Sequence, residues 1–183
     1  AEIVETGSDL RPAFADNLRA ATGCTLVVPD YRLAPEHPFP AQLEDSLKVW
    51  RWLRQDGAAH GLDADRIVAA GDSAGGQMSV ALAMALHELG LPQVAGLLLI
   101  YPVLGVDMKT PSYIRNANAP CLTRDEMGFY LRSFLGPEGS AAWRDPKDGE
   151  AAKNDGETFL LRVICAFYTL SVTTDLSYRR KPG

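Results

Sequence analysis

The sequence has few cysteines and no long apolar run. Its three cysteines, Cys24, Cys121 and Cys165, are an odd number without CxxC spacing. This pattern argues against a disulfide framework and against a zinc site, so we expect no metal or cofactor and a cytoplasmic location. The longest apolar run, Val94 to Tyr101, is far shorter than the roughly 18 residues that a membrane span requires, so we expect no transmembrane helix.

An excess of basic residues is also missing. Lys and Arg total 18 and Asp and Glu total 23, which gives a net charge of -5 at pH 7. Because no positive excess is available to neutralise a phosphate backbone, we expect no nucleic-acid partner. The sequence contains no repeat or low-complexity tract, and its 46% hydrophobic and 22% charged residues are typical of a globular protein with one ordinary core.

Hydrophobic periodicity predicts alternating helices and strands up to Tyr101. Apolar residues at helical spacing predict helices over residues 9–22, from Ala41 onward and over 74–89. Short apolar runs predict buried strands over residues 24–28, 66–71 and 94–101. Right-handed crossovers place such strands parallel in one sheet with helices on both faces, so the predicted fold class is α/β.

The pattern changes after Pro102. Residues 103–122 are predicted to be rich in loops, and a capping box at Thr123 and Glu126 predicts a helix over 124–135. Gly136 and Pro137 are expected to end that helix.

The last apolar run, residues 160–172, is rich in β-branched and aromatic residues and suggests one more strand. We divide the chain into residues 1–146, the central part of one α/β domain, and residues 147–183, a divergent C-terminal tail.

A G-x-S-x-G motif lies between the predicted strand 66–71 and the predicted helix 74–89. It reads Gly71-Asp72-Ser73-Ala74-Gly75-Gly76. In this context it is typical of a nucleophile elbow, a sharp turn that exposes a serine hydroxyl and needs small neighbours. The turn places Ser73 at the start of a helix, where the Ala74 N–H is a candidate oxyanion donor.

The motif has two other possible interpretations. A glycine-rich turn is also an ordinary short connection between a strand and a helix. A phosphate-binding loop is disfavoured because the run lacks the Lys-Ser/Thr ending of a P-loop and the G-x-G-x-x-G of a dinucleotide site.

Two segments resemble the hormone-sensitive-lipase-like family of α/β-hydrolase esterases. They are residues 30–41, which read DYRLAPEHPFPA, and the GDSAGG of residues 71–76. The resemblance covers about residues 8–146 and implies a partial α/β-hydrolase fold and a serine esterase that acts on small acyl esters through Ser73. In that family the first segment is a buttress beneath the active-site floor, which implies a structural role for residues 31–41.

A catalytic serine needs a histidine base, which in α/β-hydrolases follows the serine well downstream. The sequence contains three histidines, His37, His60 and His87. His87 follows Ser73 on the same predicted helix, and 14 residues at about 1.5 Å each put it about 20 Å away. His37 and His60 precede the serine and are expected to face solvent or cap local structure. We therefore expect this chain to carry no triad histidine.

The second oxyanion donor and the triad acid are also in question. The resembled family takes the donor from a His-Gly-Gly-Gly loop, and no such run precedes Ser8. The acid is open between Asp175, which follows the predicted strand 160–172, and Asp145 in an Asp-Pro pair. Of these two we favour Asp175, although an exposed acid in a frayed tail explains that residue more simply.

Three hypotheses follow for the function. The first is a carboxylic-ester hydrolase that forms an acyl-enzyme on Ser73. The alternative is a catalytically incomplete fragment or pseudo-enzyme of the same family, for which we expect little turnover. A purely structural binding module ranks last, because it requires the motif to be coincidental. We also expect an uncovered sheet edge, which would lower the stability of the monomer or lead to a homodimer.

Overall fold

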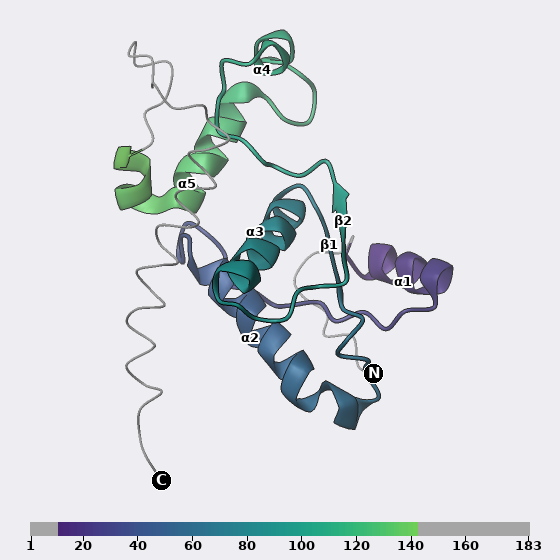
Figure 1. The fold of residues 1–183 in the computed structure, drawn as a ribbon. Coiled ribbons are helices and arrows are strands. Elements are labelled where there is room, and N and C mark those ends of the chain that lie inside the picture. The colour runs from purple at the N-terminus through teal and green to yellow at the C-terminus, as the bar shows by residue number, and fades with distance from the viewer. Residues whose placement is uncertain (1–10, 143–183) are drawn as a thin grey trace, which may run out of the picture.

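The structure is a computed structural model, and it describes residues 11–142. Figure 1 shows how its elements are arranged in space. The helices are α1 (Arg11–Thr22), α2 (Ala41–Asp56), α3 (Ala74–Glu88), α4 (Pro111–Arg115) and α5 (Arg124–Ala142), with a short 3-10 helix η1 (Gly57–His60) after α2. The strands are β1 (Val68–Asp72) and β2 (Gly96–Ile100).

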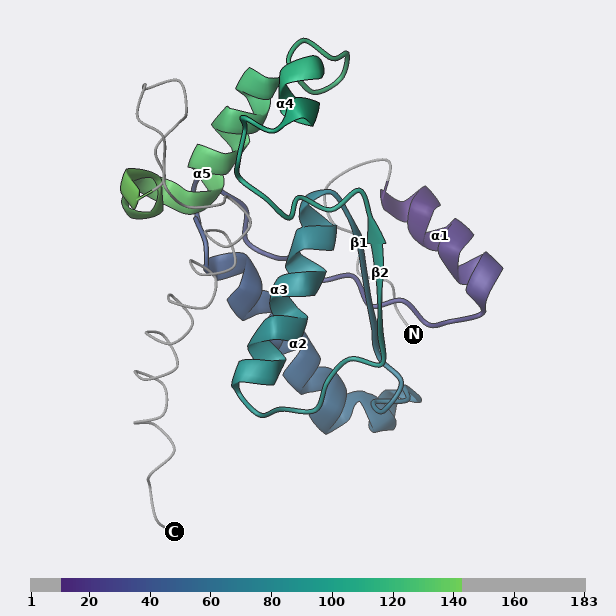
Figure 2. The same cartoon turned by 45° about the horizontal axis from the view of Figure 1, so that its top comes forward.

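The two strands pair in parallel, and α3 forms the crossover between them. Val68 lies opposite Gly96, and Asp72 lies opposite Ile100. Helix α3 packs against both strands and α2 packs against α3, whereas α1 lies on the other side of the strands in both views (Figures 1 and 2). This arrangement confirms the predicted α/β class with parallel strands and helices on both sides.

The predicted strand at residues 24–28 is wrong, because the structure has no regular secondary structure there. A strand is stable only when a neighbouring strand pairs with its N–H and C=O groups. Within residues 11–142, β1 and β2 pair with each other alone, and Val27 is exposed rather than buried. The described sheet therefore has two strands instead of the three that were predicted.

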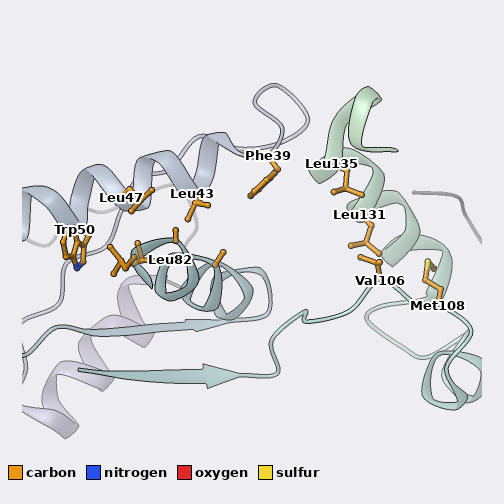
Figure 3. Packing of buried hydrophobic residues seen from close by; sticks show 12 residues of the cluster. Phe39, Leu43, Leu47, Trp50, Leu82, Val106, Met108, Leu131 and Leu135 are labelled. Atoms are coloured by element: carbon orange, nitrogen blue, oxygen red, sulfur yellow. The ribbon is translucent and has the colours of Figure 1, made fainter. Parts of the chain in front are cut away.

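The main part of the core lies between α2 and α3. On α2 the buried residues Leu43, Leu47 and Trp50 recur at the helical spacing that the sequence predicts. They point toward α3, on which Leu82 and Leu86 are buried (Figure 3). Because α3 also packs on β1 and β2, this core holds the start of α3 at a fixed place at the carboxyl end of the strands.

A second part of the core lies along α5. Val106 and Met108 are buried beside Leu131 of this helix (Figure 3). The ring of Phe39 connects this part to the loop before α2, with its centroid 5.3 Å from that of Phe134. The two parts form one apolar cluster, so the loop before α2 and helix α5 are packed together.

Helix α5 begins as the sequence predicts. The Thr123 N–H and hydroxyl both donate to Glu126 Oε2 at 2.7 Å, and the Glu126 N–H donates to Thr123 Oγ1 at 3.2 Å. These bonds hold the pKa of Glu126 below its usual value. The helix is interrupted at Gly136, which has φ 70° and is followed by Pro137, before helical structure resumes up to Ala142. The first helical stretch therefore ends at Gly136, where the sequence predicts the end, and a kink joins it to the second stretch.

Helix α4 lies in the region that was predicted to be rich in loops. Thr110 caps it by accepting a hydrogen bond from the Tyr113 N–H, and Pro111 occupies its first position. The Thr-Pro pair was the available signal for this helix. The predicted strand over residues 160–172 and the proposed boundary after residue 146 lie outside the described residues.

Candidate active site

Ser73 occupies the turn between β1 and α3 in a strained conformation. Its backbone has φ 50° and ψ -114°. A positive φ is unfavourable for a residue with a side chain, and such strain costs on the order of 1–3 kcal/mol unless the surroundings impose it. Here the Ser73 N–H donates to the Ile100 carbonyl at 2.9 Å, and the Ser73 carbonyl accepts from the Gln77 N–H at 3.1 Å. Strand β2 and helix α3 therefore hold the turn from two sides.

The small residues around Ser73 are Gly71, Ala74, Gly75 and Gly76, and lack of space explains the glycines at two of these positions. A Cβ on Gly71 would fall against the carbonyl group of Gly75 and 2.8 Å from its Cα. A Cβ on Gly76 would lie 2.9 Å from Pro102 Cβ. At Gly75 a Cβ would meet nothing within 4 Å, so lack of space does not require a glycine there. The close approach of β1 to α3 explains the requirement at Gly71.

Ala74 is the first residue of α3 and is exposed. The first N–H groups of a helix have no acceptor within it, and they lie at the positive end of the helix dipole. The Ala74 N–H is therefore one of the N–H groups at this end of α3 that have no acceptor within the helix. The last residue of β1, Asp72, lies on the other side of Ser73 and is exposed.

Tyr101 is a residue near the turn that the sequence analysis missed. It directly follows β2, its backbone has φ 37°, and its hydroxyl donates to Asp72 Oδ2 at 3.2 Å. This hydrogen bond and the charge of Asp72 raise the pKa of Tyr101. No local sequence pattern marks this residue, because only the register of β1 against β2 brings position 101 beside the motif.

The three histidines lie away from Ser73 along the chain. His87 is the next-to-last residue of α3, about 20 Å from the start of that helix. His60 ends η1, before β1 begins, and its ring lies 5.2 Å from that of Trp52. His37 is exposed in the loop before α2. Among the described residues, no side chain is hydrogen-bonded to the Ser73 hydroxyl. Asp145 and Asp175 lie outside the described residues.

The loop that the resemblance describes as a buttress is anchored to α2 through Arg32. Its Nε donates to Asp45 Oδ2 at 2.8 Å, its Nη2 donates to Glu44 Oε2 at 2.9 Å, and its backbone N–H also donates to Asp45. These donors hold the pKa of Asp45 well below its usual range. At the end of the loop, the Phe39 N–H donates to the Phe134 carbonyl of α5 at 2.8 Å. These contacts are those of a structural element.

A cavity of about 210 Å³ lies between α4 and the start of α5, with Tyr113, Arg124 and Met127 among its walls. Burial raises the pKa of Tyr113. None of the motif residues lines this cavity, so it is separate from the turn.

Over residues 11–142, no group of three or more His, Cys, Asp or Glu side chains is placed to hold a metal ion. In the same range no helix has the length and apolar character of a membrane span.

A parallel α/β sheet with a strained serine between a strand and the helix that follows it defines the α/β-hydrolase class. The chain belongs to this class, since a family model described as the alpha/beta hydrolase fold matches residues 4–164. This match, together with the esterases among its relatives, confirms the resemblance that the two sequence segments indicate.

Similar proteins include several esterases. Over 106 residues the chain is 44% identical to the carboxylesterase NlhH of Mycobacterium tuberculosis. This alignment covers 58% of the chain and 33% of NlhH. Over 159 residues it is 31% identical to an ethyl acetate hydrolase of Pseudomonas putida, covering 81% of the chain and 48% of that protein. The structure of carboxyl esterase 2 from Tuber melanosporum matches with a TM-score of 0.67 and 25% identity, over 79% of the chain and 50% of the esterase. The chain thus spans between a third and a half of the length of these relatives.

Proposed function

We propose that the chain carries the nucleophile turn of a serine ester hydrolase that acts on small acyl esters. The observation that supports this most is the positive φ of Ser73 between β1 and α3, with glycines where a Cβ would clash. In the proposed reaction, Ser73 Oγ loses its proton to a base and attacks the ester carbonyl carbon. The tetrahedral intermediate expels the alcohol, which takes up a proton, and water then hydrolyses the acyl-enzyme.

The start of α3 supplies the proposed electrostatic stabilisation. The Ala74 N–H would donate to the oxyanion of the tetrahedral intermediate, and the positive end of the α3 dipole adds to this effect. Loss of a single donor of this kind typically lowers kcat about 10²- to 10³-fold. Because Ala74 acts through its backbone, side-chain substitution there does not remove the donor.

Small acyl esters are proposed as substrates because of the relatives. One of them is named as a carboxylesterase and another as an ethyl acetate hydrolase, whose name specifies a two-carbon acyl group. A short activated ester such as p-nitrophenyl acetate is therefore the appropriate first substrate. No metal or organic cofactor takes part in the proposed reaction.

The proposal assigns no histidine as the base that accepts the proton of the Ser73 hydroxyl. The sequence has three histidines, His37, His60 and His87, and none is hydrogen-bonded to Ser73 among the described residues. We therefore expect the chain on its own to hydrolyse esters slowly, which is what the alternative of a catalytically incomplete member also predicts. Asp175 remains the proposed triad acid.

Imidazole in solution can replace a missing histidine side chain and so tests the proposal. The chain is incubated with a fluorophosphonate with and without imidazole, and peptide mass spectrometry locates the adduct. Oγ displaces fluoride from phosphorus while the base takes the hydroxyl proton. We expect phosphonylation of Ser73 that increases with imidazole concentration and is absent from Ser73→Ala. Failure to label Ser73 at any imidazole concentration would refute the proposed nucleophile.

Location and assembly are included in the proposal. Cys24 and Cys121 are free and exposed, which supports a reducing compartment, the cytoplasm. Val68, Leu97 and Leu98 are apolar strand residues that remain exposed, which supports a homodimer through the open sheet. Sedimentation equilibrium measures the assembly state, and a mass that stays monomeric at all concentrations would exclude the dimer. The net charge of -5 supports the proposal that nucleic acid is not a partner.

A further inference from the structure

We propose that Tyr101 is a positioning residue whose phenol, bonded to Asp72, holds Ser73 in its positive-φ conformation. This inference rests on the proposed function, because it assigns Tyr101 a role in the reactivity of Ser73. It concerns a residue outside the G-x-S-x-G motif.

The segment from Ile100 to Val103 contacts the turn along its whole length. The Ile100 carbonyl accepts from the Ser73 N–H at 2.9 Å, and the Val103 N–H donates to the Ser73 carbonyl at 3.3 Å. Between these two bonds, Pro102 lies so close to Gly76 that a Cβ there would be 2.9 Å from Pro102 Cβ. The segment therefore contacts the turn at Ser73 on both its N–H and its carbonyl side, and also at Gly76.

Tyr101 adds a side-chain bond to these main-chain contacts. Its hydroxyl donates to Asp72 Oδ2 at 3.2 Å, and Asp72 is covalently joined to Ser73. The bond links residues that are 29 positions apart, at the carboxyl ends of the two paired strands. Asp72-Ser73 and Ile100-Tyr101 are thus joined to each other twice, by the Ser73–Ile100 main-chain bond and by the Tyr101–Asp72 side-chain bond.

Core packing does not explain this tyrosine. Tyr101 is 71% exposed and its own backbone is strained, with φ 37°. A strained residue persists where its surroundings impose the conformation, and such residues concentrate at functional sites. The bond to Asp72 and the main-chain bonds on either side supply those surroundings. Since the ring is exposed, removal of its hydroxyl is expected to leave the core intact.

Amide hydrogen exchange at Ser73, measured by NMR, tests the proposal without any need for catalysis. Tyr101→Phe and Asp72→Ala both remove the bond, whereas Asp72→Asn keeps an oxygen that can accept from the phenol. We expect exchange at Ser73 to become about two- to tenfold faster in the first two variants, which is the effect of one modest hydrogen bond, and to be largely restored in Asp72→Asn. Tyr130→Phe, at an exposed tyrosine on α5, is the matched control and is expected to leave exchange unchanged.

The rate of imidazole-dependent phosphonylation of Ser73 is measured on the same variants. We expect Tyr101→Phe to lower it by a similar factor while the exchange of α2 amides stays at the wild-type rate. Unchanged exchange at Ser73 in Tyr101→Phe would overturn the proposal, and so would equal acceleration throughout α2, which would indicate a general structural role. If wild-type Ser73 is never labelled, the proposed function fails, and the exchange data still decide the role of Tyr101.

Discussion

The clearest test of the turn geometry is Gly71→Ala. The new Cβ would be 2.8 Å from Gly75 Cα and nearer still to the carbonyl group of Gly75, whereas carbon atoms in ordinary contact are about 3.5–4.0 Å apart. Overpacking typically costs about 1–3 kcal/mol. Because the opposing atoms are backbone at the start of α3 and cannot rotate away, we expect a loss of about 3 kcal/mol or more in the free energy of unfolding.

Alanine substitutions at Gly76 and Gly75 are matched variants for which we expect smaller losses of stability than for Gly71→Ala. At Gly76 the nearest atom is Pro102 Cβ at 2.9 Å, so Gly76→Ala is expected to cost about 1–2 kcal/mol. At Gly75 nothing lies within 4 Å, so Gly75→Ala is expected to be neutral or to stabilise α3 by up to about 1 kcal/mol.

Urea denaturation followed by circular dichroism measures all three variants. For a typical m value of about 2 kcal/mol/M, Gly71→Ala lowers the midpoint by about 1.5 M. If Gly71→Ala were as stable as Gly75→Ala, the close approach of β1 to α3 would be refuted. A stable Gly71→Ala that also labels at Ser73 normally would show that the turn does not depend on this approach.

Two further predictions concern the rest of the fold. Hydrogen bonds from Arg32 lower the pKa of Asp45, so its ionised form stabilises the fold above the ordinary value near 3.8, and this stabilisation is lost as pH falls through and below that value. The urea midpoint of wild type should therefore fall more between pH 6 and pH 3 than that of Asp45→Asn, and equal slopes would contradict this. Leu86 is 0% exposed, so Leu86→Ala should cost about 2–5 kcal/mol in urea denaturation, whereas the exposed Leu98→Ala should cost under about 1 kcal/mol. A similar cost for both would show that α3 does not lie in the core.

Elements with local signals could be predicted from the sequence. The spacing of Leu43, Leu47 and Trp50 predicts α2, and the capping box at Thr123 predicts the start of α5. The small residues around Ser73 predict a sharp turn between β1 and α3, and the structure has that turn. In each case, residues a few positions apart determine the structure.

Features that depend on distant partners could not be predicted. Residues 24–28 have a strand-like composition, but composition does not reveal whether another strand will pair with them. The bond between Tyr101 and Asp72 joins residues 29 positions apart, and only the register of β1 against β2 brings them together. Helix α4 is five residues long, which is too short for hydrophobic periodicity to show.

The labelling of a variant that lacks every histidine tests most directly whether Ser73 reacts without a base from His37, His60 or His87. In His37→Gln/His60→Gln/His87→Gln, the rate of fluorophosphonate labelling at Ser73 is compared with that of wild type, with and without imidazole. Because Ser73 lies on a reactive turn and none of these histidines is its base, we expect equal rates for the two proteins under each condition. A marked loss of labelling in the variant, restored by added imidazole, would contradict it by showing that one of the three is the base.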